Sequence, residues 1–281
     1  MPKMQPRLLA TLIAALTSAA PALAQPAASP QAQPVPAPVI LPPGPGMVEA
    51  PCPKVPEPMT EGIWNALGAY NRKYDWPWLC RYQAENAALK ARPTVVFMGD
   101  SITENWSELD SALFTGGVID RGIRGQTTPQ MVLRFRQDVV ALRPKVVHIM
   151  AGTNDIAGNT GPESPAQFQD NIRTMVDLAR ASGIKVVLGA IPPARRFTWV
   201  ATLQPAPRIV QLNRWLKSYA AANRLGFADY HAALASPDDG MKPDTSADGV
   251  HPNAEGYRLM RPVALRALAA AGVRPSGPAP R

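Results

Sequence analysis

The stretch TVVFMGDSI, at residues 94–102, carries the pattern on which the prediction of the fold rests. Its first five residues, 94–98, are rich in β-branched and aromatic side chains, as a buried strand requires. Gly99, Asp100 and Ser101 follow directly, and small polar residues of this kind end a strand in a turn. We therefore predict a strand at 94–98 with a serine just beyond its end.

The rest of the chain repeats this unit, with helices between the strands. Further strands are predicted at residues 118–120, 145–150, 184–190 and 225–230. Amphipathic helices are predicted at residues 129–142, 165–182, 207–224 and 253–271. Each helix starts at or next to a proline, which suits a first helical turn. Strands that alternate with helices predict βαβ units, a parallel sheet and an α/β fold.

Polar segments follow several of these strands. They are Gly-Asp-Ser at 99–101, a glycine-containing loop at 121–128 and Gly-Thr-Asn-Asp at 152–155, and Asp-Gly-Val-His at 248–251 precedes the last helix. Because ligands bind at the carboxyl ends of parallel strands, we expect these four segments to converge on one edge of the sheet.

Ser101 needs a general base to act as a nucleophile, and histidine is the usual one. Of the three histidines, His148 lies in a buried strand and is interpreted as a hydrogen-bonded core residue, whereas His231 reads as a loop residue. His251 has Asp248 three positions earlier, so one short loop presents a carboxylate and an imidazole together. Taken alone, this pair is better interpreted as a cap for the last helix.

Three groups near these segments can donate hydrogen bonds to a developing oxyanion. They are the backbone N–H of Ser101, the backbone N–H of Gly125 and the side-chain amide of Asn154. Each has a structural alternative, because glycine and Asn-Asp sequences also occur in ordinary turns.

As an ordered set, the four segments resemble the blocks of the SGNH hydrolases, also called the GDSL esterase/lipase family. The blocks read Gly99-Asp100-Ser101-Ile102, 122–128, Gly-Thr-Asn-Asp at 152–155 and Asp-Gly-Val-His at 248–251, with isoleucine where leucine is often written. The resemblance covers residues 94–271. It implies a flavodoxin-like, three-layer α/β/α sandwich with a five-stranded parallel sheet.

The resemblance also implies a mechanism. Ser101 would be the nucleophile, His251 the base and Asp248 its orienting acid, and Ser101, Gly125 and Asn154 would form the oxyanion hole. The implied reaction is ester hydrolysis through an acyl-serine, which needs neither a metal ion nor an organic cofactor. No Gly-x-Ser-x-Gly surrounds Ser101, which argues against an α/β-hydrolase.

The ends of the 281-residue chain differ from its body. Residues 1–24 combine a basic start, an apolar run and Ala-Leu-Ala, a pattern typical of a secretory signal, with an uncleaved anchor as the alternative. Residues 25–58 contain 12 prolines in 34 positions and predict an extended linker. We expect a helical extension at 59–93 that packs on the domain at 94–272, and a flexible tail at 273–281.

Export would place the protein in a periplasmic or extracellular compartment, where cysteines form disulfides. Cys52 and Cys80 are the only two cysteines and are a candidate pair, with two independent thiols as the alternative. No Cys-x-x-Cys occurs and the histidines are scattered, so a metal site is not expected.

The substrate is less well defined by the sequence. We expect a short acyl ester, chiefly acetyl, on a small molecule or glycan. The candidates for substrate contact are Asp100, Arg124, Phe197 and Trp199, the last two in a loop that follows the fourth strand. Alternatives with the same fold are a lysophospholipase or thioesterase, an acyltransferase and a non-catalytic glycan-binding module.

Composition excludes other classes. Hydrophobic residues make up 46% of the chain, which is too many for a fully disordered protein. The net charge of +8 could favour nucleic acid, but the basic residues are dispersed along the chain without interleaved aromatics, so we expect no nucleic-acid partner. Stable membrane insertion is not expected after signal cleavage, and the sequence leaves the oligomeric state undetermined.

Overall fold

The computed structural model describes residues 40–41, 44, 46–56, 58 and 60–275. The predicted signal at 1–24, much of the linker at 25–58 and most of the tail at 273–281 lie outside the described residues.

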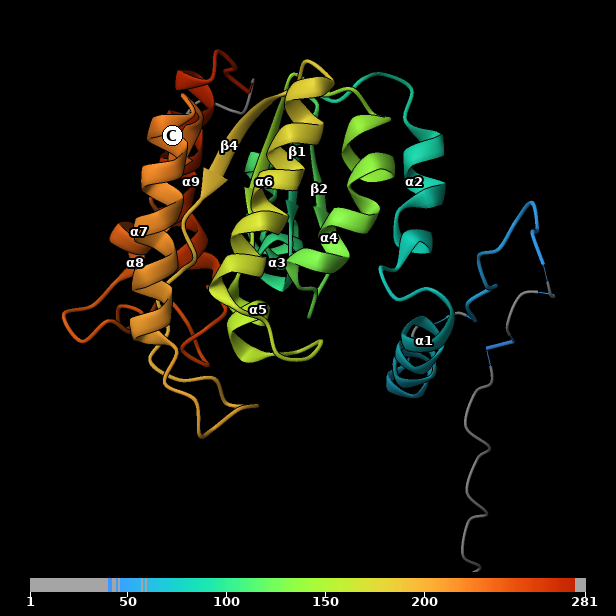
Figure 1. Ribbon diagram of the computed structural model, residues 1–281, viewed down its shortest axis with the longest axis horizontal. Coiled ribbons are helices and arrows are strands. Elements are labelled where there is room, and N and C mark those ends of the chain that lie inside the picture. Colours follow the sequence, from blue (N-terminus) through green and yellow to red (C-terminus); the bar gives the residue numbers. More distant parts are fainter. Residues whose placement is uncertain (1–39, 42–43, 45, 57, 59, 276–281) are drawn as a thin grey trace, which may run out of the picture. The chain divides into compact units, whose positions relative to one another are not determined.

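A five-stranded parallel sheet forms the centre of the fold (Figure 1). The strands are β1 (Val95–Gly99), β2 (Val118–Gly122), β3 (Val146–Met150), β4 (Lys185–Gly189) and β5 (Gly226–Ala228). Their order across the sheet is β2-β1-β3-β4-β5. The predicted α/β fold with a parallel sheet is confirmed, and β5 is shorter than the predicted 225–230.

The four predicted helices are present with small changes at their ends. They are α4 (Thr128–Phe135), α6 (Pro165–Ala181), α7 (Ala206–Ala222) and α9 (Ala254–Ala270). The helix predicted at 129–142 is interrupted, because α4 passes into a π-helical turn, η3 (Arg136–Val140). Three helices were not predicted: α3 (Ser101–Leu109), α5 (Thr153–Ala157) and α8 (Tyr230–Leu234).

The helices cover the sheet in two layers because successive strand side chains point to opposite faces. Val96, Met98 and Ile149 belong to a core shared with α4, α6 and α7. Val95 and Phe97 belong to the other core, with α3, α8 and α9. The result is the three-layer α/β/α sandwich, in which α4 and α6 lie in front of the sheet in the view of Figure 1.

The segment before β1 is helical and makes specific contacts with the domain. It contains α1 (Glu61–Tyr74), η1 (Leu79–Arg81) and α2 (Gln83–Ala88). The Tyr82 hydroxyl donates to the carbonyl of Gly122, and Asn86 Nδ2 donates to Asp138 Oδ1 at 2.8 Å. Cys52 and Cys80 form a disulfide bond, which joins the chain ahead of α1 to η1.

Within the described part of the chain, no helix combines the length and the apolar character that crossing a bilayer requires.

Candidate active site

The strand order creates a crevice at the carboxyl end of β1. The chain places β2 on one side of β1 and β3 on the other, and the loops after β1 and β3 therefore run to opposite sides. Ser101 follows β1 and Asn154 follows β3. The two residues therefore flank this crevice, as the sequence predicts.

Ser101 is the first residue of α3, and Asp100 caps that helix. Asp100 Oδ1 accepts a hydrogen bond from the N–H of Ile102 at 2.9 Å. N–H groups in a first helical turn have no partner within the helix. The N–H of Ser101 has no protein acceptor among the described residues, so it remains available beside its own hydroxyl.

The hydroxyl, an imidazole and a carboxylate form a continuous chain of hydrogen bonds. Ser101 Oγ lies 2.9 Å from His251 Nε2, and His251 Nδ1 lies 2.6 Å from Asp248 Oδ2. Because Asp248 accepts, Nδ1 carries the ring proton, and the unprotonated Nε2 faces the serine. This arrangement lets His251 take the proton of Ser101.

Asp248 is held as a carboxylate by several donors. Its Oδ1 accepts from the N–H groups of Val250 and His251 at 2.9 and 2.8 Å. Partial burial opposes ionisation, but the hydrogen bonds from the side chain and backbone of His251 outweigh it and lower the pKa of Asp248 to about 2. The carboxylate is therefore ionised at neutral pH and fixes the orientation of the imidazole.

The other two histidines lie elsewhere. His148 is fully buried in β3, its Nε2 lies 2.7 Å from the Tyr230 hydroxyl, and its ring stacks on Phe97. Burial lowers the pKa of His148 to about 3, so this side chain is a neutral core residue. His231 lies in α8.

Two further donors border the crevice. Gly125 has φ +77°, a left-handed conformation that favours glycine, and its N–H has no acceptor among the described residues. Asn154 Nδ2 donates to the carbonyl of Gln126 at 3.0 Å and lies 3.4 Å from Asp100 Oδ2. The contact with Asp100 is long and therefore weak. The amide hydrogen of Asn154 that makes it is the one that can donate to an oxyanion instead.

Asn159 connects the amide of Asn154 to the loop that carries Trp199. Asn159 Nδ2 donates to Asn154 Oδ1 at 2.8 Å, and Trp199 Nε1 donates to Asn159 Oδ1 at 3.1 Å. The Trp199 ring lies 6.3 Å from the His251 ring, centroid to centroid. Trp199 is thus held over the crevice by a hydrogen bond that also orients Asn154.

These groups line a cavity of about 370 Å³. The lining residues are Ser101, Asn105, Arg124, Gly125, Asn154, Asn159, Trp199 and His251.

Of the four candidates for substrate contact, Arg124 and Trp199 line this cavity, but Phe197 and Asp100 do not. Phe197 is fully buried and stacks beneath Trp199, with ring centroids 5.0 Å apart. Asp100 is buried behind Ser101, and burial raises its pKa to about 7 despite the hydrogen bond from Ile102. Both therefore lie behind residues of the cavity wall and not at its surface.

The segment before β1 also reaches the site. Arg124 Nε lies 3.0 Å from Glu104 Oε2, and its guanidinium lies 5.2 Å from the ring centroid of Trp64 in α1. Half of the Arg124 side chain is still exposed. One cavity wall therefore depends on α1.

A buried arginine forms hydrogen bonds with two of the segments that carry the cavity residues. Arg134 Nη2 donates to the carbonyl of Gly99 at 3.0 Å, and its Nε donates to Gln126 Oε1 at 2.5 Å. Its Nη1 pairs with Asp138, and both side chains are fully buried. Arg134 therefore joins the end of β1 to the loop of Gly125.

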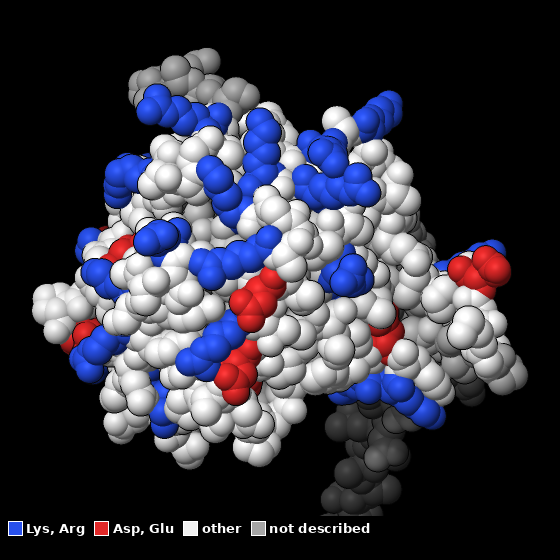
Figure 2. Space-filling view, turned by 45° about the horizontal axis from the view of Figure 1, so that its top comes forward, with Lys and Arg blue, Asp and Glu red and all other residues white. Residues whose placement is uncertain are grey.

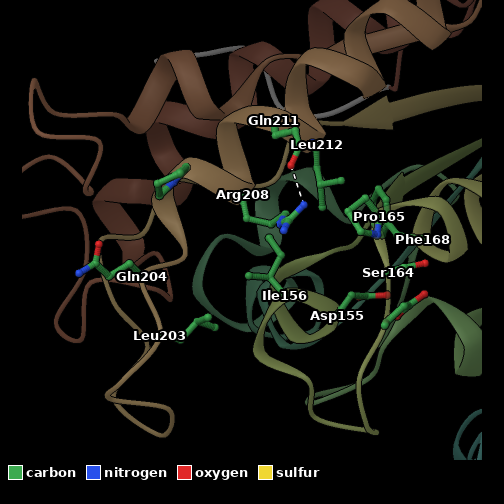
Figure 3. A pocket seen from close by; sticks show the side chains of 12 residues that line it. Asp155, Ile156, Ser164, Pro165, Phe168, Leu203, Gln204, Arg208, Gln211 and Leu212 are labelled. Atoms are coloured by element: carbon green, nitrogen blue, oxygen red, sulfur yellow. Dashed lines mark hydrogen bonds between the residues drawn. The ribbon is translucent and has the colours of Figure 1, made fainter.

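A second cavity, of about 390 Å³, begins at the residue after Asn154 (Figure 3). Asp155 is one of its lining residues, and its Oδ1 accepts from the N–H and the hydroxyl of Thr128. The Thr128 hydroxyl lies within hydrogen-bond distance of both Asp155 Oδ1 and Glu163 Oε1, so the two carboxyl groups are neighbours and a proton held by one of them can be shared with the other. Burial and the neighbouring Asp155 raise the pKa of Glu163 to about 8. Glu163 is therefore the protonated partner at neutral pH.

Among the residues with described positions, no group of three or more histidine, cysteine, aspartate and glutamate side chains is placed to hold a metal ion.

Asn105 and Asn159 are the lining residues that sequence reasoning missed. Both are single asparagines outside the four motif blocks, and nothing in their neighbours' pattern distinguishes them from ordinary helix and loop residues. The cavity becomes visible only once the loops are placed.

A family model, that of the GDSL-like lipase/acylhydrolase family, matches residues 97–259. A GDSL-like lipase of known structure from Bacteroides thetaiotaomicron VPI-5482 is 42% identical, with a TM-score of 0.67, over 70% of this chain and 99% of that chain. An acetylxylan esterase from Geobacillus stearothermophilus is 20% identical, with a TM-score of 0.53, over 64% of this chain and 95% of that chain, and it shares the fold.

Among curated proteins, the uncharacterized lipoprotein YqeF of Bacillus subtilis (strain 168) is 39% identical over 74 residues. The match spans 25% of this chain and only 30% of that protein's length. The evidence for the family is the family model, whose match includes Ser101, Asn154 and His251, together with the Bacteroides structure, which is matched over nearly its whole length. The chain therefore belongs to the GDSL-like lipase/acylhydrolase family and is a carboxylic ester hydrolase.

Proposed function

We propose that this protein is an exported serine esterase that removes short acyl groups, chiefly acetyl, from carbohydrate. The observation that carries the proposal is the hydrogen-bonded chain from Ser101 through His251 to Asp248, with three donors beside it. Ser101 is the nucleophile, His251 the general base and Asp248 its orienting acid.

The reaction proceeds in two steps. His251 Nε2 accepts the proton of Ser101 as Oγ attacks the ester carbonyl, and the N–H groups of Ser101 and Gly125 and the amide of Asn154 stabilise the oxyanion. The alcohol leaves with the proton from His251, which gives an acyl-serine. A water molecule activated by His251 then attacks the acyl-serine and releases the acid.

A short acyl group fits the character of the cavity. Among its described lining residues, Trp199 is the only large apolar side chain, and asparagine, serine, histidine and arginine supply most of the others. A long acyl chain would need a continuous apolar wall to bury its methylene groups. An acetyl group does not.

The rim of the cavity suits a sugar. The Trp199 side chain is 43% exposed and rests on Phe197, so it offers a fixed apolar platform. Asn105, Asn159 and Arg124 surround it with hydrogen-bonding groups. The fold is shared with an acetylxylan esterase, so deacetylation of a glycan is chemistry that this fold serves in another protein.

Export is supported by two independent features. The pattern of residues 1–24 is typical of a secretory signal, and Cys52 pairs with Cys80. Disulfides persist in oxidising compartments.

The test is a series of p-nitrophenyl esters from acetate to palmitate, measured with the wild-type protein and with Ser101→Ala. We expect the highest kcat/KM for acetate and butyrate, and a loss of at least about a thousandfold in Ser101→Ala. A maximum at long chains would replace the proposal with lipid or thioester hydrolysis.

The carbohydrate assignment has its own test. Trp199→Ala removes the hydrogen bond to Asn159 for every substrate but removes stacking only for a sugar, so kcat/KM should fall about tenfold more for an acetylated oligosaccharide than for ethyl acetate, which has no ring. An equal loss on both substrates would argue against a sugar-stacking role.

A further inference from the structure

The edge of the sheet opposite the active site carries only basic charge in its loops. The segments that precede the five strands are 89–94, 114–117, 141–145, 182–184 and 223–225, and residues 271–275, which follow α9, adjoin them through Lys185. None of these six segments contains an aspartate or glutamate. Eight cations lie in these segments, in the last turn of α6 or at the first residue of β4. We call them the basic face: Lys90, Arg92, Arg143, Lys145, Arg180, Lys185, Arg224 and Arg274.

Backbone and side-chain contacts show that these segments adjoin one another. The N–H of Lys185 donates to the carbonyl of Lys145, and the N–H of Lys145 donates to that of Thr94, both at 3.1 Å. Lys185 Nζ donates to the carbonyl of Ala271 at 2.9 Å. Figure 2, which turns this edge toward the viewer, shows lysine and arginine side chains spread widely over it with few carboxylates between them.

All eight side chains belong to exposed residues, and none forms an ion pair within the described part of the chain. Arg92, Arg143 and Lys145 line a hollow of about 470 Å³ together with Ser182 and Gly183. Unpaired cations around a hollow without carboxylates attract anions. The charge of this face is therefore available to a partner.

The shape of the array indicates which anion it fits. Its members come from separate loops across the width of the sheet, about 20 Å for five strands, and do not follow one groove or helix as a linear polyanion would require. The exposed aromatic side chains among the described residues, Tyr74, Trp76 and Trp199, lie on other segments, so no platform for stacked bases or sugar rings accompanies the charge. A broad, unpaired, non-aromatic array complements a plane of phosphate groups.

We propose that the basic face docks the protein on a bilayer that contains anionic phospholipids. The attraction is electrostatic, because Lys and Arg side chains near an anionic membrane surface each contribute to binding. Ser101 lies at the other end of the strands, so docking leaves the active-site cavity facing away from the bilayer. This proposal does not depend on which ester is hydrolysed.

The experiment is co-sedimentation of the full chain with two kinds of vesicle, phosphatidylcholine alone and equal parts of phosphatidylcholine and phosphatidylglycerol. We expect at least about tenfold tighter binding to the anionic vesicles. The difference should disappear between about 0.05 M and about 0.5 M NaCl, because salt screens exposed charges. Binding through insertion of the apolar residues 8–20 would be the same for both kinds of vesicle and would persist at high salt.

A matched pair of triple variants then locates the surface. Arg92→Gln/Arg143→Gln/Lys145→Gln should weaken binding to anionic vesicles about tenfold or more. Arg72→Gln/Lys73→Gln/Arg214→Gln, which removes three exposed cations from α1 and α7, should change it less than about threefold. Thermal unfolding followed by circular dichroism checks that both variants are folded.

Three results would overturn the proposal. One is equal binding of the wild-type protein to neutral and anionic vesicles at low salt. Another is an equal loss of binding to anionic vesicles in both triple variants, which would show that binding depends on net charge and not on the basic face. The third is tighter, variant-sensitive binding to heparin or duplex DNA than to vesicles, which would make a polymer the partner.

Discussion

Asn159 shows how a residue outside the proposed triad can control the reaction. It receives a hydrogen bond from Trp199 and gives one to Asn154. Small errors in the position of a donor are costly, because an oxyanion must be met at hydrogen-bond distance. Asn159 is therefore a positioning residue that couples the rim of the cavity to the proposed oxyanion hole.

We predict that Asn159→Ala lowers kcat for p-nitrophenyl acetate about tenfold and leaves KM within about threefold. Asn159→Asp should stay impaired, because a carboxylate accepts from Trp199 but has no hydrogen to donate to Asn154. Asn105→Ala, which removes another amide from the same cavity, should act mainly on KM. An unchanged kcat in Asn159→Ala would contradict the coupling.

At this scale the sequence predicts the residues that belong to motifs and misses those that do not. Ser101, Asn154 and His251 stand at strand ends or before a helix, so the topology alone brings them to one edge. Phe197 and Trp199 lie two positions apart in an irregular loop, and nothing in its sequence indicates which ring is exposed. The structure buries Phe197 and leaves Trp199 at the cavity.

At the scale of elements, Glu163 joins three helices through one shared proton. It precedes α6 and accepts from Asn171 Nδ2 of that helix at 2.8 Å, it accepts from the Thr128 hydroxyl of α4 at 3.3 Å, and it shares a proton with Asp155 of α5. Its pKa is raised to about 8 by burial and by Asp155, so the folded protein keeps it protonated where the unfolded chain does not. Over that range the unfolded chain binds fewer protons, and stability falls as pH rises.

Glu163→Gln replaces the shared proton with an amide hydrogen that does not titrate. We predict that the variant and the wild type have the same free energy of unfolding below about pH 4.5. As the pH rises toward about 8, the wild type loses stability and the variant does not, so the variant becomes the more stable of the two. Above that pH the difference should level off. The measurement is urea unfolding at several pH values, with Glu108→Gln, an exposed position on α3, as the control. A constant difference at every pH would refute the shared-proton account.

The long elements follow from the sequence more reliably than the short ones. The helix predicted at 165–182 and the observed α6 agree because its apolar period and its Ser164 capping box act over many residues. By contrast, α5 has five residues, and its local sequence is also typical of a turn. The π-helical end of α4 coincides with the buried pair of Arg134 and Asp138, a tertiary contact that no local pattern reveals.

At the scale of the whole molecule, the disulfide ties the N-terminal segment to the domain. Cys52 and Cys80 are separated by 28 positions, and α1, whose Trp64 supports Arg124, lies between them. Closing a loop of this length restricts the unfolded chain. The bond therefore stabilises a wall of the active-site cavity as well as the fold.

We predict that reduction lowers the free energy of unfolding by about 2–4 kcal/mol. The measurement is guanidinium unfolding with and without reductant, which gives the free energy of unfolding of the oxidised and reduced protein. The variant Cys52→Ser/Cys80→Ser should equal the reduced wild type and show no further response to reductant. A wild-type protein whose unfolding midpoint is unaffected by reductant would contradict this prediction.

The distribution of charge over the surface is the property that the sequence predicts least well. The basic residues are dispersed along the chain, yet the parallel topology brings the loops before each strand to one edge. Spacing along the sequence therefore says little about spacing on the surface of a βαβ protein. The same topology gathers the motif loops at the opposite edge, which is why the family and the fold could be predicted together.

The central claim is that Ser101 forms the acyl-enzyme with His251 as its base. Mass spectrometry of the protein after reaction with a fluorophosphonate, a serine-directed reagent, tests it most directly. We predict a single covalent adduct on the peptide that contains Ser101, absent from Ser101→Ala and formed far more slowly by His251→Ala. An adduct on another residue, or ester hydrolysis that persists in Ser101→Ala, would contradict the account.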